Sequence, residues 1–147
     1  MKKSLIVLVL TVCLLLAACG SGGTSMSGDS GNTEDMASSA ANMDAYHKIT
    51  AEQAKKMMDE GGVTVVDVRT EQEYKSGHIP GSILVPNEEI GTEQPKELPD
   101  QDAVLLVHCR TGIRSKEASD KLVKMGYKNV YDFGGIVDWP YETVEEK

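Results

Sequence analysis

The chain has 147 residues, 40% of them hydrophobic, and carries 23 acidic against 15 basic residues for a formal net charge of −8. This length suits one ordinary domain once the ends are set aside. The acidic balance argues against nucleic acid or an anionic membrane surface as the main partner, so an anionic substrate would need a locally positive pocket.

The first residues have the pattern of an export signal. Two lysines precede an almost wholly apolar run over residues 5–18, which is too short and wrongly flanked for a stable membrane span. The run ends in LAACG at 16–20, which resembles the lipobox of bacterial lipoproteins. The resemblance implies that residues 1–18 are removed and that Cys19 is lipidated, which would anchor the protein to a bacterial membrane outside the cytoplasm. The alternative is an ordinary signal peptide with an incidental Cys19.

Residues 19–45 are predicted to be the lipidated cysteine and a flexible linker. The segment is rich in Gly, Ser, Thr, Asn and Asp, and it cannot bury enough apolar surface to offset its ordering entropy. Cys13 leaves with the signal, so Cys109 is the one thiol left in the domain at 46–147. A lone thiol in an exported domain is either buried and inert or present for its chemistry.

The domain at 46–147 alternates helix and strand signals. Strands are predicted at 63–68, 82–85, 103–107 and 130–133. Helices are predicted from Thr50 to Gly61, at 70–75, at 115–125, and as a short segment after Gly135. Thr50 and Gln53 have the spacing of a capping box. Strands separated by helices predict an α/β domain with a mostly parallel sheet.

Cys109 lies between the end of a predicted buried strand and a helix that is expected to begin at about Ser115. Ligands of α/β sheets bind beyond the carboxyl ends of strands, and a helix N-terminus stabilises a thiolate or another anion. Arg110 and Arg114 add positive charge, and Gly112 permits a tight turn. The alternative is a small buried cysteine that closes a strand, with both arginines in solvent.

Three motifs in order resemble those of the rhodanese family over residues 46–141. They are DVR with EYKSGHIPG at 67–69 and 73–81, CRTGIR at 109–114, and FGGIVDW at 133–139. The resemblance implies a three-layer domain with a mostly parallel central sheet flanked by helices. It also implies a sulfurtransferase that needs no metal or organic cofactor.

The resemblance implies that the Cys109 thiolate takes the outer sulfur of thiosulfate, a persulfide or a polysulfide. The resulting persulfide then passes its sulfur to a thiol or cyanide. The active-site loop comprises Arg110, Thr111, Gly112, Ile113 and Arg114. Its backbone N–H groups are expected to stabilise the charged sulfur. Arg110 is expected to meet an anionic donor, Thr111 to offer its hydroxyl, and Arg114 to orient the loop or hold the donor.

Polar residues outside the loop are expected to support it. Asp67, Arg69 and Glu73 are predicted to form an ion-pair network that braces the loops, rather than to act as catalytic acids or bases. Arg69 is the only one of the three that is expected near the pocket. His78 is predicted to make a structural hydrogen bond in its turn. His108 is expected to point to the opposite face from Cys109, because side chains alternate along a strand.

Two other functions remain open from the sequence. A non-catalytic rhodanese-like module that senses sulfur or docks a partner would share the fold. A cysteine phosphatase or arsenate reductase is disfavoured, because such enzymes resemble Cys-x5-Arg, whereas Cys109 and Arg114 are spaced Cys-x4-Arg. The protein is expected to be a monomer on its tether.

Overall fold

The computed structural model describes residues 44–146. The predicted signal, Cys13, Cys19 and nearly all of the predicted linker lie outside the described residues. No helix among residues 44–146 is long and apolar enough to cross a membrane.

Five strands form one sheet in the described range, all of them paired in parallel in the order β1-β5-β4-β2-β3. The strands are β1 (Tyr46–Lys48), β2 (Val63–Asp67), β3 (Ile83–Leu84), β4 (Val104–Cys109) and β5 (Asn129–Gly135). The α-helices are α2 (Ala51–Glu60), α3 (Glu71–Lys75) and α4 (Ile113–Lys124), and a 3-10 helix, η1, spans Ile136–Asp138. The predicted α/β fold with a parallel sheet is therefore confirmed.

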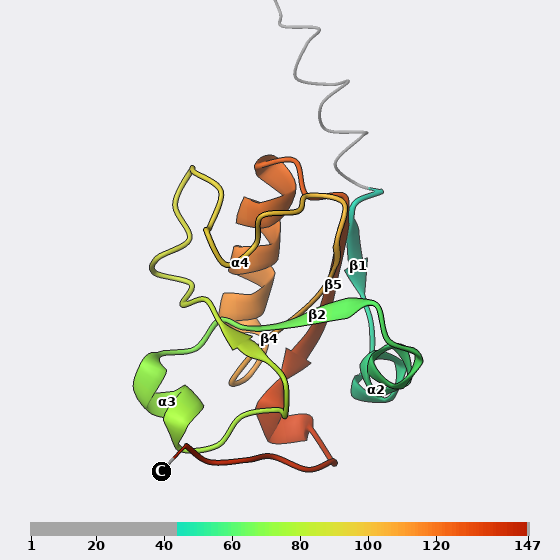
Figure 1. Ribbon diagram of the computed structural model, residues 1–147, viewed down its shortest axis with the longest axis vertical. Helices are drawn as coiled ribbons and strands as arrows, with labels where there is room; N and C mark the ends of the chain where they lie inside the picture. Colours follow the sequence, from blue (N-terminus) through green and yellow to red (C-terminus); the bar gives the residue numbers. More distant parts are fainter. Residues whose placement is uncertain (1–43, 147) are drawn as a thin grey trace, which may run out of the picture. The chain divides into compact units, whose positions relative to one another are not determined.

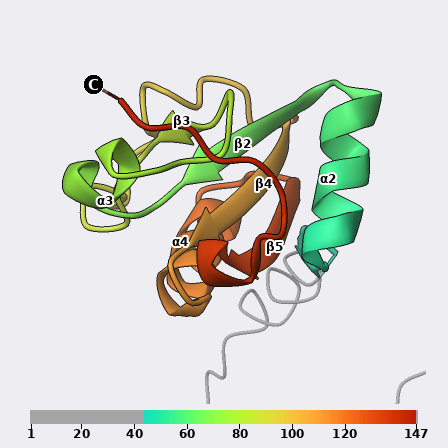
Figure 2. The same cartoon turned by 90° about the horizontal axis from the view of Figure 1, so that it is seen from below.

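The sheet separates two apolar layers, because successive side chains of its strands point to opposite faces. Leu105 and Val107 pack with Leu122 of α4 on one face. Leu106 packs with Ala54 of α2 on the other face. Figures 1 and 2 show α4 and α2 on opposite sides of the strands. The expected three-layer arrangement is thus confirmed.

Both ends of α2 follow the sequence signals. The Thr50 side chain accepts from the backbone N–H of Gln53 at 3.2 Å, and the Gln53 side chain accepts from the Thr50 N–H at 2.9 Å. Gly61 caps the other end. The capping box predicted from the sequence is confirmed.

Several elements differ from the prediction, among them β3 and β5, whose predicted ranges were 82–85 and 130–133. The edge strand β1 was not predicted, because it has only three residues and depends on pairing with β5. Strand β4 continues to Cys109, and α4 begins at Ile113, two residues before Ser115. The turn between strand and helix is therefore only residues 110–112, which places Cys109 close to the first turn of α4.

Parallel pairing brings the carboxyl ends of the strands to one edge of the sheet. Asp67 ends β2, Cys109 ends β4, and Gly135 ends β5. These ends are the place where an α/β sheet holds a ligand, so the candidate site is built from this edge.

Candidate active site

Cys109 lies at the junction of β4 and α4, with only 1% of its surface exposed. Its Sγ accepts a hydrogen bond from the backbone N–H of Gly112 at 3.1 Å. Gly112 is the N-cap residue of α4 and has φ of +102°, a left-handed conformation that L side chains rarely adopt. The sulfur therefore lies at the N-terminus of α4, and a helix N-terminus carries partial positive charge.

The end of β5 lies directly against the Cys109 loop. A Cβ placed on Gly135 would lie 2.4 Å from the Arg110 carbonyl oxygen and 2.8 Å from the Thr111 Cα. The Val137 N–H donates to the same Arg110 carbonyl at 3.3 Å. Gly135 was seen in the sequence only as part of a closing motif, and its close approach to the loop depends on the pairing of β4 with β5.

Arg114 forms a bidentate ion pair with Glu73 of α3, with nitrogen–oxygen distances of 2.8 and 2.9 Å. Glu73 also closes a capping box with Thr70 at the start of α3. Hydrogen bonding from Arg114 lowers the Glu73 pKa from 4.5 to about 2, and the same bond raises the Arg114 pKa. The sequence placed Glu73 in an ion-pair network but did not identify Arg114 as its partner.

The low pKa of Glu73 predicts a pH dependence of stability. Because the folded pKa is depressed, the pair contributes stability above pH 4.5 that is lost as the pH falls toward about 2. Glu73→Gln removes this contribution. Between pH 4.5 and about 2, the free energy of unfolding of the variant should therefore fall by about 1 kcal/mol less than that of the wild type. The difference is this small because solvent screens a pair whose side chains are about a quarter exposed. Denaturant unfolding at several pH values measures the difference.

The matched control is Glu60→Gln, which removes an exposed ion pair with Lys56 whose atoms lie 3.8 Å apart. It should follow the wild-type curve closely. If Glu73→Gln and Glu60→Gln show the same pH dependence, the Arg114–Glu73 pair does not stabilise the fold.

Asp67 and Arg69 form the second part of the supporting network. The Asp67 carboxylate is fully buried and accepts from Nε and Nη2 of Arg69, the closest approach being 2.6 Å. Arg69 Nη2 also donates to the Gly77 carbonyl at 2.8 Å. These contacts join the end of β2 to the turn after α3. Glu73 pairs with Arg114 and not with Arg69, and both Glu73 and Arg69 line a groove beside the loop, so the prediction that only Arg69 lies near the pocket is wrong.

Both histidines of this region have structural contacts. His78 Nδ1 lies 3.0 Å from the Tyr74 carbonyl, and the two rings stack. His108 is fully buried with its ring against Phe133, on the opposite face from Cys109, as predicted. Burial lowers the pKa of His108, which favours the uncharged ring at its 3.7 Å approach to Asp67.

A groove of about 340 Å³ opens beside the loop. It is lined by Arg69, Gln72, Glu73, Ser76, Gly77, Arg110, Ile136 and Val137. Arg110 and Thr111 are exposed. Two apolar side chains near the loop are also exposed, Ile113 at 70% and Val137 at 60%. Of the three arginines of the region, Arg110 alone has no carboxylate partner within the described residues.

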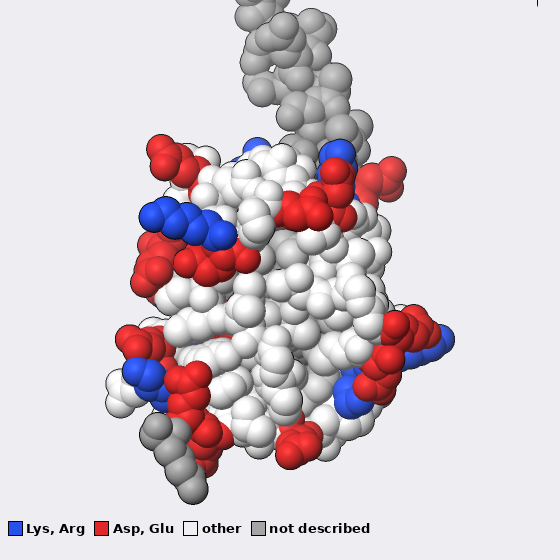
Figure 3. All heavy atoms as spheres, in the orientation of Figure 1, with Lys and Arg blue, Asp and Glu red and all other residues white. Residues whose placement is uncertain are grey.

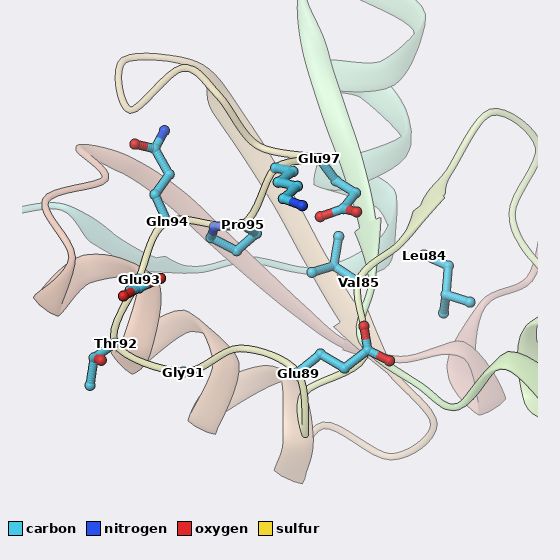
Figure 4. A pocket seen from close by; sticks show the side chains of 10 residues that line it. Leu84, Val85, Glu89, Gly91, Thr92, Glu93, Gln94, Pro95 and Glu97 are labelled. Carbon is cyan, nitrogen blue, oxygen red and sulfur yellow. The ribbon is translucent and has the colours of Figure 1, made fainter.

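A larger hollow of about 450 Å³ lies elsewhere, within the segment between β3 and β4 (Figure 4). Its lining includes Glu89, Glu93 and Glu97 and no residue of the Cys109 loop. Three carboxylates against the single cation of Lys96 make it unsuited to a small anion. On the face of the domain shown in Figure 3, basic side chains lie beside acidic ones without forming a basic patch.

No group of three or more His, Cys, Asp or Glu side chains within residues 44–146 is arranged to hold a metal ion. Arg110 and Thr111, both exposed, follow Cys109 in the loop beside the groove.

The sequence is similar to known proteins over the same region. The model of the rhodanese-like domain matches residues 50–141. The tRNA uridine(34) hydroxylase of Yersinia pestis is 30% identical over 105 residues, which are 68% of this chain and 30% of that protein. The chain thus spans about a third of the length of the curated relatives it matches.

Two solved structures show the same fold. A rhodanese from E. coli, solved with anions, is 30% identical with a TM-score of 0.52, covering 56% of this chain and 98% of that one. A rhodanese-related protein from Thermoplasma volcanium is 31% identical with a TM-score of 0.60, covering 69% of this chain and 100% of that one.

Proposed function

The chain belongs to the rhodanese-like domain family, and on that premise we propose that it is a sulfurtransferase that carries sulfur on Cys109. The donor is thiosulfate, a persulfide or a polysulfide, and the acceptor is a thiol or cyanide. The observation that carries the proposal is the 3.1 Å hydrogen bond from the Gly112 N–H to Cys109 Sγ at the start of α4. A backbone N–H at a helix start can donate to a negatively charged sulfur in that place, whether thiolate or persulfide.

The reaction proceeds in two displacements. The Cys109 thiolate attacks the outer sulfur of thiosulfate, a sulfur–sulfur bond forms, and the bond to the inner sulfur breaks so that sulfite leaves with the electron pair. The persulfide keeps one negative charge. Cyanide or a thiolate then attacks the outer sulfur of this persulfide, and the Cys109 thiolate leaves. Two half-reactions on one nucleophile give a ping-pong pattern.

The short loop favours sulfur over phosphate chemistry. Only residues 110–112 separate β4 from α4, and Cys109 is 1% exposed. A single terminal sulfur atom can reach such a nucleophile more readily than a phosphoryl group with its oxygens. Arg114, which would complete a phosphate cradle, is held by Glu73 through two hydrogen bonds.

The proposed setting is the outer side of a bacterial membrane, with the domain held by a lipid on Cys19. The support is the LAACG sequence at 16–20 after an apolar run, followed by a segment of flexible composition. Metabolic labelling with a fatty-acid analogue, compared with a Cys19→Ser chain, tests the anchor.

The test of the activity is trapping of the intermediate. The protein is mixed with excess thiosulfate, desalted and weighed by intact mass spectrometry. The expected result is one added sulfur atom that cyanide or a thiol removes. If neither thiosulfate, polysulfide nor a small persulfide gives the adduct, the chain is a sulfur-independent binding module. Release of phosphate from an aryl phosphate would instead identify a phosphatase.

Arg110 is expected to bind the anionic donor, because it is exposed at the groove and has no carboxylate partner within the described residues. Arg110→Gln should raise the KM for thiosulfate about tenfold or more and change kcat much less, as loss of a charged hydrogen bond predicts. Steady-state kinetics with a varied thiosulfate concentration measures both constants.

The control for Arg110→Gln is Lys124→Gln, which removes the same charge at the far end of α4. Its KM should stay at the wild-type value, because solvent and salt screen so distant a charge. An equal rise in both variants would mean that net charge, rather than Arg110, attracts the donor.

A further inference from the structure

A buried carboxylate lies on β5 next to the Cys109 loop. Asp132 is 1% exposed and accepts four hydrogen bonds or ion-pair contacts. Its Oδ1 accepts from Ser115 Oγ at 2.8 Å and from the Gly134 N–H at 2.9 Å. Its Oδ2 accepts from the Tyr46 hydroxyl at 3.1 Å and forms an ion pair with Lys48 Nζ at 3.0 Å. All its contacts are therefore supplied by β1, α4 and the end of β5.

The Oδ1 side connects Asp132 to the sulfur. The Ser115 hydroxyl lies between Asp132 Oδ1 at 2.8 Å and the Gly112 carbonyl oxygen at 3.0 Å, and its single proton can be donated to either. The Gly112 N–H donates to Cys109 Sγ. On the other side, a Cβ on Gly112 would lie 3.6 Å from the Gly134 Cα. Asp132 thus accepts hydrogen bonds from both Ser115 and Gly134, and Gly112 lies close to both of these residues.

The Oδ2 side balances the charge. A buried carboxylate near an anionic sulfur would disfavour the anion, because like charges repel strongly in a low-dielectric interior. Lys48 offsets that charge at 3.0 Å and is itself 54% exposed. Tyr46 stays protonated as a donor, since burial and then the Asp132 charge raise its pKa. Lys116, which pairs with Asp120, lies 4.7 Å from the centre of the Tyr46 ring.

We propose that Asp132 is a positioning residue for Cys109, acting through Ser115 and Gly134 to aim the Gly112 N–H at the sulfur. Lys48 and Tyr46 of β1 hold the carboxylate in place. The inference rests on the proposed role of Cys109 as nucleophile. It also makes β1, the strand next to the predicted tether, part of the active-site structure.

The experiment measures the reactivity of Cys109 without any sulfur donor. The full-length chain is alkylated with iodoacetamide at about pH 7 and about pH 10, on either side of the ordinary cysteine pKa. The rate is read on the tryptic peptide 97–110, which contains Cys109 and no other cysteine. The rate at about pH 7 divided by the rate at about pH 10 reports how well the protein stabilises the thiolate. A merely structural change leaves this ratio unaltered.

The matched pair of variants is Ser115→Ala and Ser119→Ala. Both hydroxyls are fully buried on α4, but Ser119 Oγ has no hydrogen-bond partner among the described residues. The ratio should fall about tenfold in Ser115→Ala, as loss of a hydrogen bond in a charged network predicts, and stay unchanged in Ser119→Ala.

Asp132→Ala should lower the ratio at least as much as Ser115→Ala, and Asp132→Asn should restore most of it, because an amide oxygen can still accept from Ser115 and Gly134. Circular dichroism confirms that each compared variant is folded. The proposal is overturned if Ser115→Ala and folded Asp132→Ala both keep the wild-type ratio. Because alkylation needs no sulfur donor, a wild-type chain that accepts no sulfur would overturn the proposed function separately.

Discussion

Replacing Cys109 with serine is expected to lower sulfur transfer by at least about 10³-fold, because the nucleophile is lost and no second thiol is present in residues 44–146. A serine hydroxyl stays protonated at neutral pH and forms no persulfide. The Gly112 N–H can still donate to its oxygen, so the loop should keep its conformation. Formation of thiocyanate from thiosulfate and cyanide measures the loss.

The thermal unfolding of Cys109→Ser is the control for folding, since the exchange of sulfur for oxygen at a buried site changes little volume. A folded variant that retains a tenth or more of the wild-type rate would show that Cys109 is not the sulfur carrier. The trapped adduct provides an independent check, because it should be absent from the tryptic peptide 97–110 of the variant.

Local sequence was sufficient for the parts of the fold that depend on local signals. The apolar run at β4 predicts a buried strand, and Thr50 with Gln53 predicts the start of α2. Local signals also predicted the position of Cys109, because the cysteine lies between the predicted strand before it and the predicted helix after it. Strand β1 was missed, since its hydrogen bonds come from β5, more than eighty residues away.

The partners of charged side chains were harder to predict. Glu73 and Arg114 are 41 residues apart, and the pair forms only because β2 and β4 are neighbours in the sheet. Asp132 carried no signal of its own in the sequence. Its position beside Ser115 depends on α4 packing against β5, which no local pattern specifies.

Gly135 is a position where packing, rather than backbone conformation, requires glycine. Its φ of −111° is open to any residue, but a Cβ would lie 2.4 Å from the Arg110 carbonyl oxygen and 2.8 Å from the Thr111 Cα. Because both neighbours are backbone, Gly135→Ala must move the loop or the end of β5. We expect a loss of about 1–3 kcal/mol in the free energy of unfolding from overpacking. A shift of about 1 Å in the loop should also lower sulfur transfer about 10²-fold.

Denaturant unfolding and thiocyanate formation measure the two effects of Gly135→Ala separately. The matched control is Gly91→Ala, because a Cβ at Gly91 meets no atom within 4 Å and the backbone there is not left-handed. That variant should keep wild-type stability to within about 0.5 kcal/mol and full activity. If Gly135→Ala behaves like Gly91→Ala, the loop tolerates displacement, and close contact with β5 is not what positions Cys109. A loss of activity larger than the loss of stability explains would instead mean that β5 sets the geometry of the sulfur-carrying loop.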